Sequence, residues 1–412
     1  MKRRMACLLV FLAAGAVFSS AGFAELTTQE ATRLEADYIL SCQYLQDGSG
    51  ANGAINNVYG DPTWVVPGEN AVAIMGLLAA SEALGDDVYR QRAQLAGDYL
   101  VRMQNTSDGA WYDQYSYDAS VTAARSTRQT AQVMMALDKL GYDPARYAAM
   151  KKGAEFLMNT QNVAYKGGQD DGLVAGGKNE DGEYHTWRWA SDNAYAYQAF
   201  KAASAWAAAN GDTAFAVQAG QAADKVAEGI NLVLFSAEGT HWVRVIDKDG
   251  IPVAGQDYAD WISYAPLMLD VPLTGGISDD VSEWIHETLQ KTNGALAWDD
   301  AAESDRMSPG YSFQAALVWL DADKLGYVDS AVAWAEDSGL WNLDSGGWVD
   351  WLEESGGSAQ GWERFIDTSA YYIMIKNNGY DFNADTVVPE PASLALFVLG
   401  GGLFWQKKRR VL

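Results

Sequence analysis

The sequence contains little that could crosslink the chain or hold a metal ion. It has two cysteines, and Cys7 lies in an N-terminal segment that we expect to be removed, which would leave only Cys42. The histidines His185, His241 and His286 are widely separated and form no His-Glu-x-x-His pattern. We therefore expect no intramolecular disulfide, no metal and no cofactor, so that stability must come from side-chain packing.

Basic residues are also scarce. The chain has 29 Lys and Arg against 54 Asp and Glu, a formal net charge of −25 at pH 7. Such a surface repels phosphate backbones, so we expect no nucleic-acid partner. The sequence also lacks a Gly-x-Ser-x-Gly nucleophile elbow and a phosphate-binding glycine loop, which argues against serine hydrolases of that type and against nucleotide-binding enzymes.

The N-terminal segment has the features of a secretion signal. Three basic residues in the first four positions precede an apolar stretch over 5–18 and a small-residue exit that ends at Ala24. The apolar stretch is short for a membrane span. This order of regions predicts a cleavable signal peptide over 1–24 and a mature chain that starts at Glu25.

The C-terminal segment 387–412 contains a Pro-Glu-Pro triplet, an apolar stretch over 392–405 and a basic cluster over 407–410. These three parts together resemble the PEP-CTERM sorting signal. The resemblance implies transient membrane anchoring, removal by an exosortase, and delivery to the outer surface or the extracellular matrix; a plain tail anchor is the alternative. Loss of seven basic residues and Glu390 with the two end segments would leave 22 basic against 53 acidic residues, a net charge near −31.

The region 25–386 reads as one domain, because it contains no low-complexity linker and its apolar residues recur with helical spacing throughout. The spacing predicts an all-α chain of about twelve helices. The expected helices span 27–46, 68–84, 86–105, 127–140, 144–162, 190–210, 212–235, 257–269, 279–291, 311–325, 328–341 and 362–378.

The connections between these helices alternate in character. Four are short and contain a glycine that can end a helix in the left-handed conformation, at Gly85, Gly141, Gly211 and Gly326. The others are long and rich in glycine, aromatic and acidic residues. We therefore expect the short turns at one end of the molecule and the long loops at the other.

Four helices that precede a long loop end in a glutamine followed by glycine, at Gln43, Gln104, Gln161 and Gln290. Repeated hairpin endings are typical of architectures in which each helical hairpin buries a face on its neighbours. The pattern resembles the (α/α)6 toroid of six-hairpin glycosidases and of terpenoid cyclase domains. An open helical solenoid is the alternative.

One stretch departs from the helical pattern. Over 241–255, alternating apolar residues flank Asp249-Gly250, a strong two-residue turn signal, which predicts a small inserted β-hairpin. Calcium binding by Asp247 and Asp249 is the alternative reading of this turn.

In such a ring the N-termini of the inner helices open at the same end, where their N–H groups and dipoles favour carboxylates and polar ligands. Carboxylates, tryptophans and arginines at those positions suit a carbohydrate site, because aromatic rings stack on sugar faces and polar groups bind the hydroxyls. Since glycosidic cleavage commonly uses two carboxyls, the catalytic candidates are Asp192 and Asp260, with Glu69 and Asp367 as substitutes. The substrate-binding candidates are Arg128, Trp187, Arg188, Trp189, Asn193, Tyr258, Trp261, Tyr311 and Arg364.

Each candidate also has a purely structural reading. An aspartate at a helix start is often a cap, which applies to Asp192 and Asp367. Tryptophan and tyrosine at helical spacing are often core residues. The string ADWISYAPLML resembles an inner-helix segment of unsaturated glucuronyl hydrolases, and that resemblance implies that Asp260 is the proton donor.

A terpenoid cyclase relative is the least favoured alternative. The strings TRQTAQVMMALDKLGYDP and DTSAYYIMIKNNGYDF resemble inner-helix repeats of that superfamily, but no Asp-x-Asp-Asp motif occurs in the chain. We read the acidic cluster at 299–305 as a solvated loop. The sequence thus predicts an exported hydrolase or lyase of a polysaccharide or oligosaccharide, with a non-catalytic carbohydrate-binding or structural matrix protein as the alternative.

Overall fold

We describe a computed structural model of the chain. The ranges whose structure is described are 26–46, 50–57, 65–113, 124–164, 170–236, 239–254, 258–273, 278–300, 306–349, 352–353 and 364–377. The predicted signal peptide 1–24, the predicted sorting segment 387–412 and most of the acidic loop 299–305 lie outside these ranges. No helix of the described ranges is both long enough and apolar enough to cross a membrane.

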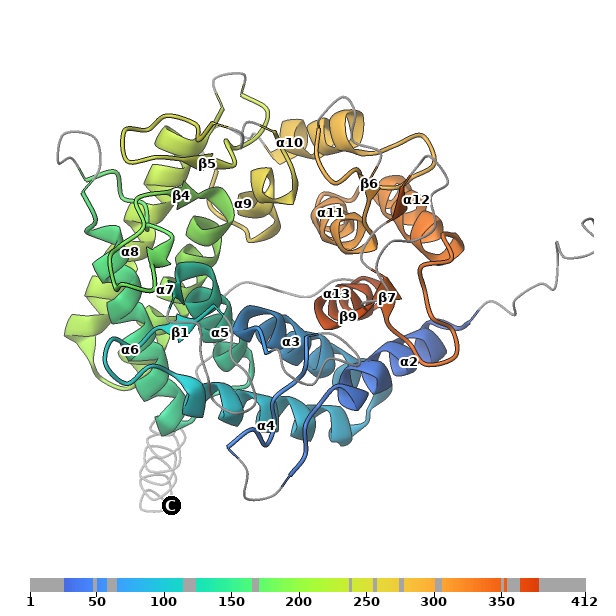
Figure 1. The fold of residues 1–412 in the computed structure, drawn as a ribbon, viewed down its shortest axis with the longest axis horizontal. Coiled ribbons are helices and arrows are strands. Elements are labelled where there is room, and N and C mark those ends of the chain that lie inside the picture. The colour runs from blue at the N-terminus through green and yellow to red at the C-terminus, as the bar shows by residue number, and fades with distance from the viewer. Residues whose placement is uncertain are drawn as a thin grey trace, which may run out of the picture.

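Six helices surround a common axis as an inner ring. Each contacts the next and the last contacts the first, so the ring is closed (Figure 1). The closure confirms the predicted toroid, and the open solenoid is wrong. The inner helices are α3 (Pro67–Leu84), α5 (Thr127–Lys139), α7 (Ala190–Ala209), α9 (Ala265–Met268), α11 (Pro309–Asp321) and α13 (Ile366–Lys376).

The outer layer consists of six helices that alternate with the inner ones along the chain. They are α2 (Thr28–Ser41), α4 (Asp87–Met103), α6 (Pro144–Gln161), α8 (Thr213–Gly229), α10 (Ser278–Trp284) and α12 (Leu325–Asp337). One turn of π-helix extends α8 over Ile230–Leu234 and α10 over Ile285–Leu289.

The two layers differ in how their sequences bury side chains. In α4 the buried residues recur on one stripe that includes Tyr89, Ala93, Ala96 and Leu100, as expected for a helix with one solvated face. In α3 nearly every residue from Pro67 to Ser81 is buried. The helix α3 is therefore buried on nearly all sides, because it contacts both the outer layer and its neighbours in the ring.

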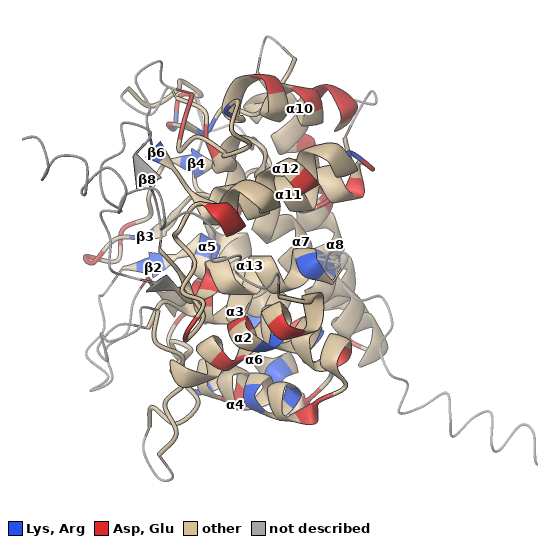
Figure 2. Ribbon diagram, turned by 90° about the vertical axis from the view of Figure 1, so that its right-hand side faces the viewer, with Lys and Arg blue, Asp and Glu red and all other residues tan. Residues whose placement is uncertain are grey.

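Short turns and long loops lie at opposite ends of the ring, as predicted (Figure 2). Gly85, Gly141 and Gly211 have positive φ at the ends of α3, α5 and α7. The prediction at Gly326 is wrong, because Gly326 lies in the first turn of α12. There the left-handed residue is Asp323, with φ 56°, since a short polar side chain tolerates this conformation.

The predicted helix over 257–269 is also wrong. Asp257 lies outside the described ranges, Asp260 is extended, and only a 3-10 turn at Trp261–Ser263 and the four residues of α9 are helical. Pro266 cannot donate a backbone hydrogen bond, which limits helix formation here. The inner helix at this position, α9, is therefore the shortest of the six inner helices that the structure describes.

Four small antiparallel sheets lie among the long loops. Their strands are β1 (Trp111–Tyr112), β2 (Arg125–Ser126) and β3 (Gly177–Lys178) in one sheet, β4 (Arg188–Trp189) with β5 (Val245–Ile246), β6 (Arg306–Met307) with β8 (Leu352–Glu353), and β7 (Trp348–Val349) with β9 (Arg364–Phe365).

The hairpin predicted over 241–255 is present as a tight turn. Gly250 N donates to Asp247 O at 3.1 Å and Val253 N donates to Val245 O at 3.3 Å. The residues after the turn pair with β5 through an antiparallel bridge between Ile246 and Pro252, and the other edge of β5 pairs with β4. The turn thus lies in the loop between α8 and α9, and the pairing of β5 with β4 holds this loop beside the start of α7.

The predicted glutamines share one structural role. Gln43, Gln104 and Gln161 each use Nε2 to donate to a glycine carbonyl in the following loop and to a carbonyl of the next outer helix. Gln290 makes the loop contact, to Gly294 O at 3.0 Å. These side chains therefore connect successive hairpins at the end that carries the long loops.

The first and last hairpins meet at a buried carboxylate. Glu35 of α2 is 0% exposed, and its Oε1 accepts hydrogen bonds from Trp341 Nε1 at 2.6 Å and from Gly347 N at 3.1 Å. Asn377 Nδ2, after α13, also donates to Thr32 Oγ1 at 3.0 Å. Contacts between residues more than 300 positions apart thus close the ring.

Candidate functional site

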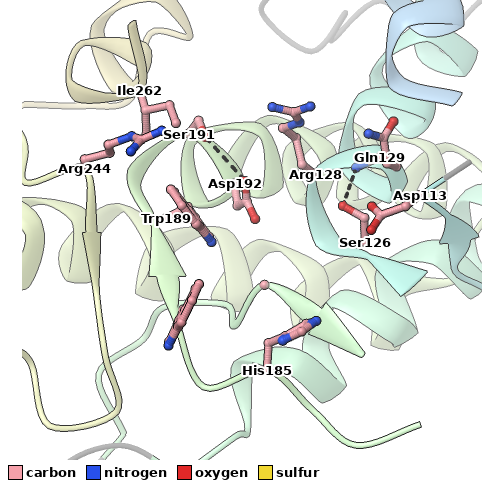
Figure 3. Close-up of a pocket in the computed structure, with 12 residues that line it drawn as sticks. Asp113, Ser126, Arg128, Gln129, His185, Trp189, Ser191, Asp192, Arg244 and Ile262 are labelled. Atoms are coloured by element: carbon pink, nitrogen blue, oxygen red, sulfur yellow. Dashed lines mark hydrogen bonds between the residues drawn. The ribbon is translucent and has the colours of Figure 1, made fainter. Parts of the chain in front are cut away.

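A cavity of about 660 Å³ lies at the N-terminal ends of α5 and α7. Asp192 and Arg128 come from these two helices, with Trp189 beside Asp192, and Arg244 and Asp113 lie at opposite ends of the cavity (Figure 3). The sequence predicted the end of the ring at which this cavity lies.

A repeated contact fixes the orientation of the inner helices. The fourth residue of α3, α5, α7 and α11 is Asn70, Thr130, Asn193 or Ser312, and its side-chain oxygen accepts a hydrogen bond from the backbone of the preceding loop at 2.7–3.1 Å. The residue just before it therefore occupies an equivalent place in each helix. These third residues are Glu69, Gln129, Asp192 and Tyr311.

Asp192 is buried, with 7% of its surface exposed, and it lines the cavity. Burial raises the pKa of its carboxyl to about 7, opposed by Arg128 and by the hydrogen bond from Ser191 Oγ at 3.3 Å. The negative charge of Asp113 adds to the increase. A carboxyl of this kind exists in both protonation states near neutral pH, as a proton donor requires.

Asp113 follows β1 and lines the same cavity. The protein around its carboxyl raises its pKa above the ordinary value, while a hydrogen bond from Ser126 and the charges of Arg128 and His185 oppose the increase. Two carboxyls that influence each other's protonation therefore face one cavity.

Arg128 is half-buried between these carboxyls and Glu69. Burial alone would lower the pKa of the guanidinium, but the charges of Asp192, Tyr195 and Glu69 raise it. Arg128 is thus a permanent positive charge among several acidic groups.

Aromatic side chains border the cavity. Trp187 is 44% exposed, and its ring meets that of Trp189 edge-on at a centroid distance of 6.2 Å. Arg244 lies over the rings of Trp189 and Tyr258, at 5.3 and 4.2 Å. Trp187 and Trp189 thus line the cavity, and Tyr258 adjoins it through Arg244; contact of these residues with a ligand stays a prediction.

Trp261 and Tyr311 lie beside Arg128. The Arg128 guanidinium is 5.8 Å from the Trp261 ring centroid, and Trp261 is 6.4 Å from Tyr311. Both rings are partly exposed, so they remain candidates for ligand contact at the centre of the ring.

Glu69 lines a second cavity, of about 470 Å³. Asp113, Arg128 and Gln129 border both cavities, so the two adjoin. The structure therefore brings two of the four catalytic candidates, Glu69 and Asp192, to neighbouring cavities.

Asp260 borders neither cavity. Its carboxyl is 2% exposed, caps the 3-10 turn by accepting from Ile262 N at 2.9 Å, and pairs with Arg244 Nε at 3.0 Å. Burial raises its pKa to about 6, against the opposing charge of Arg244. Because Arg244 lines the first cavity, Asp260 is placed to orient that side chain.

Asp367 lies in the first turn of α13 and accepts from Thr368 N at 2.8 Å. Burial raises the pKa of its carboxyl, and Arg128 opposes the increase. It borders neither cavity. The backbone of Arg364 lies in β9.

Arg188 and Asn193 require a correction, because neither is exposed to a ligand. Arg188 is 0% exposed and pairs with Asp171 at 2.5 Å, where it holds the loop before β4. Asn193 is 0% exposed and bonds to both backbone groups of Val174. Their polar groups are engaged in fixing loops to α7, not in lining the cavity.

Sequence reasoning missed Asp113, His185 and Arg244 as cavity residues. None lies at the start of an inner helix, which is where the candidates were sought. Asp113 lies two residues after the buried Trp111, in the stretch Gly-Ala-Trp-Tyr-Asp, and this position in the repeated loop was the available signal.

Within the described ranges, no group of three or more His, Cys, Asp or Glu side chains is arranged to hold a metal ion. The carboxyls, guanidinium groups and indole rings that line the first cavity can supply proton transfer, charge stabilisation and stacking.

No protein-family model matches the sequence, and no curated protein sequence matches it. Solved structures do. Cellobiose 2-epimerase from Bacillus thermoamylovorans B4167 superposes with a TM-score of 0.66 at 11% identity, covering 84% of this chain and 98% of that one. D-mannose isomerase gives 0.65 at 13% identity, covering 88% and 98%.

A glycosidase in complex with glucose gives a TM-score of 0.63 at 11% identity, covering 85% of this chain and 96% of that one. All three are sugar-processing enzymes by name. At such low identity, the likeness establishes that this chain has the fold of these proteins, an (α/α)6 toroid.

Proposed function

We propose that this chain is an enzyme that acts on a polysaccharide or oligosaccharide, with Asp192 as the general acid and Asp113 as the second carboxyl. The observation that carries the proposal is the presence of both carboxyls in one cavity that is bordered by Trp187 and Trp189. The likeness of the fold to sugar-processing enzymes supports it.

The aromatic border supports sugar binding. A pyranose ring has an apolar face that stacks on indole, and its hydroxyls require fixed polar partners. Trp187 offers an exposed ring, while Gln129, Ser191 and Arg128 offer polar groups in the same cavity.

The pair of carboxyls supports acid and base chemistry. Asp192, with a pKa of about 7, retains a proton to donate to a leaving oxygen, and the charge of Asp113 contributes to this raised pKa. Glycoside hydrolases use such a pair, and a lyase also needs a base and an acid. Arg128 stabilises negative charge between them.

The test is an incubation of the protein with a panel of neutral, acidic and amino polysaccharides and oligosaccharides, followed by mass spectrometry and NMR of the products. Hydrolysis adds one water per bond cleaved, whereas elimination leaves an unsaturated end. Either product with the parent protein, and none with Asp192→Asn, supports the proposal.

A second candidate reaction is the epimerisation or isomerisation of a sugar. His185 lines the same cavity as Asp113 and Asp192, so a second kind of proton carrier is present there. In this case, the product has an unchanged mass and a changed stereochemistry or carbonyl position, which the same NMR spectra detect.

A non-catalytic carbohydrate-binding or structural matrix protein remains the alternative outside catalysis. It predicts that glycans bind, that Trp187→Ala weakens binding, and that no panel member is converted. That result would reject the enzyme proposal and retain the carbohydrate site.

We also propose that the protein is exported and delivered to the cell surface or matrix by its two end segments. The basis is the sequence of 1–24 and of 387–412. The secreted protein should begin at Glu25 and lack the C-terminal basic cluster, as judged by mass spectrometry. A cell-associated protein that retains both ends would contradict the proposal.

A further inference from the structure

The second cavity differs in charge from the first. The first cavity has Asp113 and Asp192 together with Arg128, Arg244 and His185. The second has the carboxyls of Glu69, Asp113 and Glu180, and Arg128 is the single cationic residue among the described residues that line it. Its lining is therefore acidic.

The two cavities form parts of one site. Asp113, Arg128 and Gln129 line both, and Asp113 and Gln129 lie across the first cavity from Arg244 (Figure 3). The combined volume can take more than one sugar ring, since about 470 Å³ lies beyond the shared residues. A ligand seated on Trp187 and Trp189 can thus extend past Arg128 into the acidic part.

A buried amide in the second cavity also indicates a polar ligand. Asn57 lines the cavity and is 9% exposed, yet its Oδ1 accepts no hydrogen bond from any residue that the structure describes. Leaving a buried acceptor unsatisfied is costly, which favours a ligand that donates a hydrogen bond there. An ammonium group is such a donor, and it carries the charge that the carboxyls attract.

We infer that the second cavity is a subsite for a positively charged sugar residue, a hexosamine with an unsubstituted amino group, within the glycan bound by the first cavity. This inference rests on the proposed carbohydrate function. Glu69, Asp113 and Glu180 supply the negative charge, and Asn57 supplies an uncharged acceptor. The same charges disfavour uronic acids in this position.

The test compares two tetrasaccharides with the same β-1,4-linked glucose backbone, cellotetraose and the glucosamine tetramer, by calorimetry at about pH 6 and low ionic strength. We expect the protein to bind the glucosamine tetramer about tenfold more tightly, since several charges act across a partly enclosed cavity. Added salt should reduce the preference.

Glu180→Gln tests the charge, because it preserves the side-chain shape. We expect the preference to fall to about threefold. Glu183→Gln is the matched control: Glu183 is an exposed glutamate of the same loop that does not line the cavity, and its variant should keep the full preference. Trp187→Ala should weaken both tetrasaccharides by the same factor.

The outcomes separate the two proposals. Equal affinity for the two tetrasaccharides, or a preference unchanged by Glu180→Gln, overturns the amino-sugar subsite and leaves the carbohydrate function standing. Failure of every glycan in the panel to bind or react overturns both.

Discussion

At the scale of single residues, the chemistry of the site depends on where a carboxyl stands relative to one arginine. Asp192 and Glu69 hold the same position in α7 and α3, and Arg128 projects between them from α5. The sequence predicted all three, because helix starts could be located from the hydrophobic pattern. Asp113 and Arg244 also border the cavity but lie in loops, where the hydrophobic pattern does not locate a residue; for Asp113 the repeated loop was the available signal.

Asp192→Asn should lower turnover by about 10²–10⁴-fold, because the amide cannot donate the acidic proton. In the parent protein, the rate should fall as pH rises through about 7, where Asp192 loses its proton. A pH profile of kcat/KM measures this effect. Asp224→Asn, an exposed substitution on α8, is the control and should retain the parent profile. A parent rate that is level across neutral pH would contradict the assignment.

The pH dependence of the free energy of unfolding tests the raised pKa of Asp260. Its folded pKa of about 6 exceeds the ordinary 3.8, so its carboxyl contributes stability that is complete below pH 3.8 and is lost as pH rises through 6. Asp260→Asn removes this titration. We expect the free energy of unfolding of the parent, relative to the variant, to fall by on the order of 3 kcal/mol between pH 4 and pH 7.

Urea unfolding of the parent and of the variant at several pH values measures this difference in the free energy of unfolding. A cost of losing the ion pair with Arg244 that is the same at every pH does not affect the change with pH. A difference that does not change with pH would show that burial has little effect on the Asp260 carboxyl.

At the scale of elements, the sequence predicted the positions of most helices, because helices with capping aspartates and glycine stops are marked locally. Asp86, Asp143 and Asp212 all cap helices as expected. The prediction for 257–269 was wrong because Pro266 interrupts a helix that spans this whole range, and only the segment from Ala265 to Met268 forms an α-helix. Strand pairing, such as β4 with β5, depends on the closed ring and could not be predicted from neighbours in sequence.

The glycines of the long loops offer a prediction at this scale. Gly109 has φ 81°, and a Cβ there would overlap the carbonyl oxygen of Lys152 on α6. Gly109→Ala should therefore reduce the free energy of unfolding by roughly 3 kcal/mol or more, since both backbone strain and steric overlap act.

Gly85→Ala is the matched control. Gly85 also has positive φ, at 62°, but a Cβ there meets no heavy atom within 4 Å. Gly85→Ala should reduce the free energy of unfolding by only about 1–2 kcal/mol, because only the strain of the left-handed conformation acts there. If thermal unfolding showed that Gly109→Ala and Gly85→Ala are destabilised equally, the close contact between Gly109 and α6 would have no effect on stability.

At the scale of the whole molecule, a single buried carboxylate joins the two ends of the ring. Glu35→Ala should reduce the free energy of unfolding by about 3–5 kcal/mol, because Trp341 Nε1 and Gly347 N would lose their shared acceptor. Urea unfolding measures this. Glu82→Ala, an exposed substitution on α3, should cost less than about 0.5 kcal/mol. Equal effects of the two would show that closure does not depend on Glu35.

The contacts of Glu35 also determine when the ring can close during synthesis. When α2 leaves the ribosome, the partners of Glu35 have not been made, and about 300 residues must follow before Trp341 appears. Until then, the carboxylate remains in water and the first hairpin has no neighbour on one side. The ring can therefore close only after the chain has been made as far as Gly347.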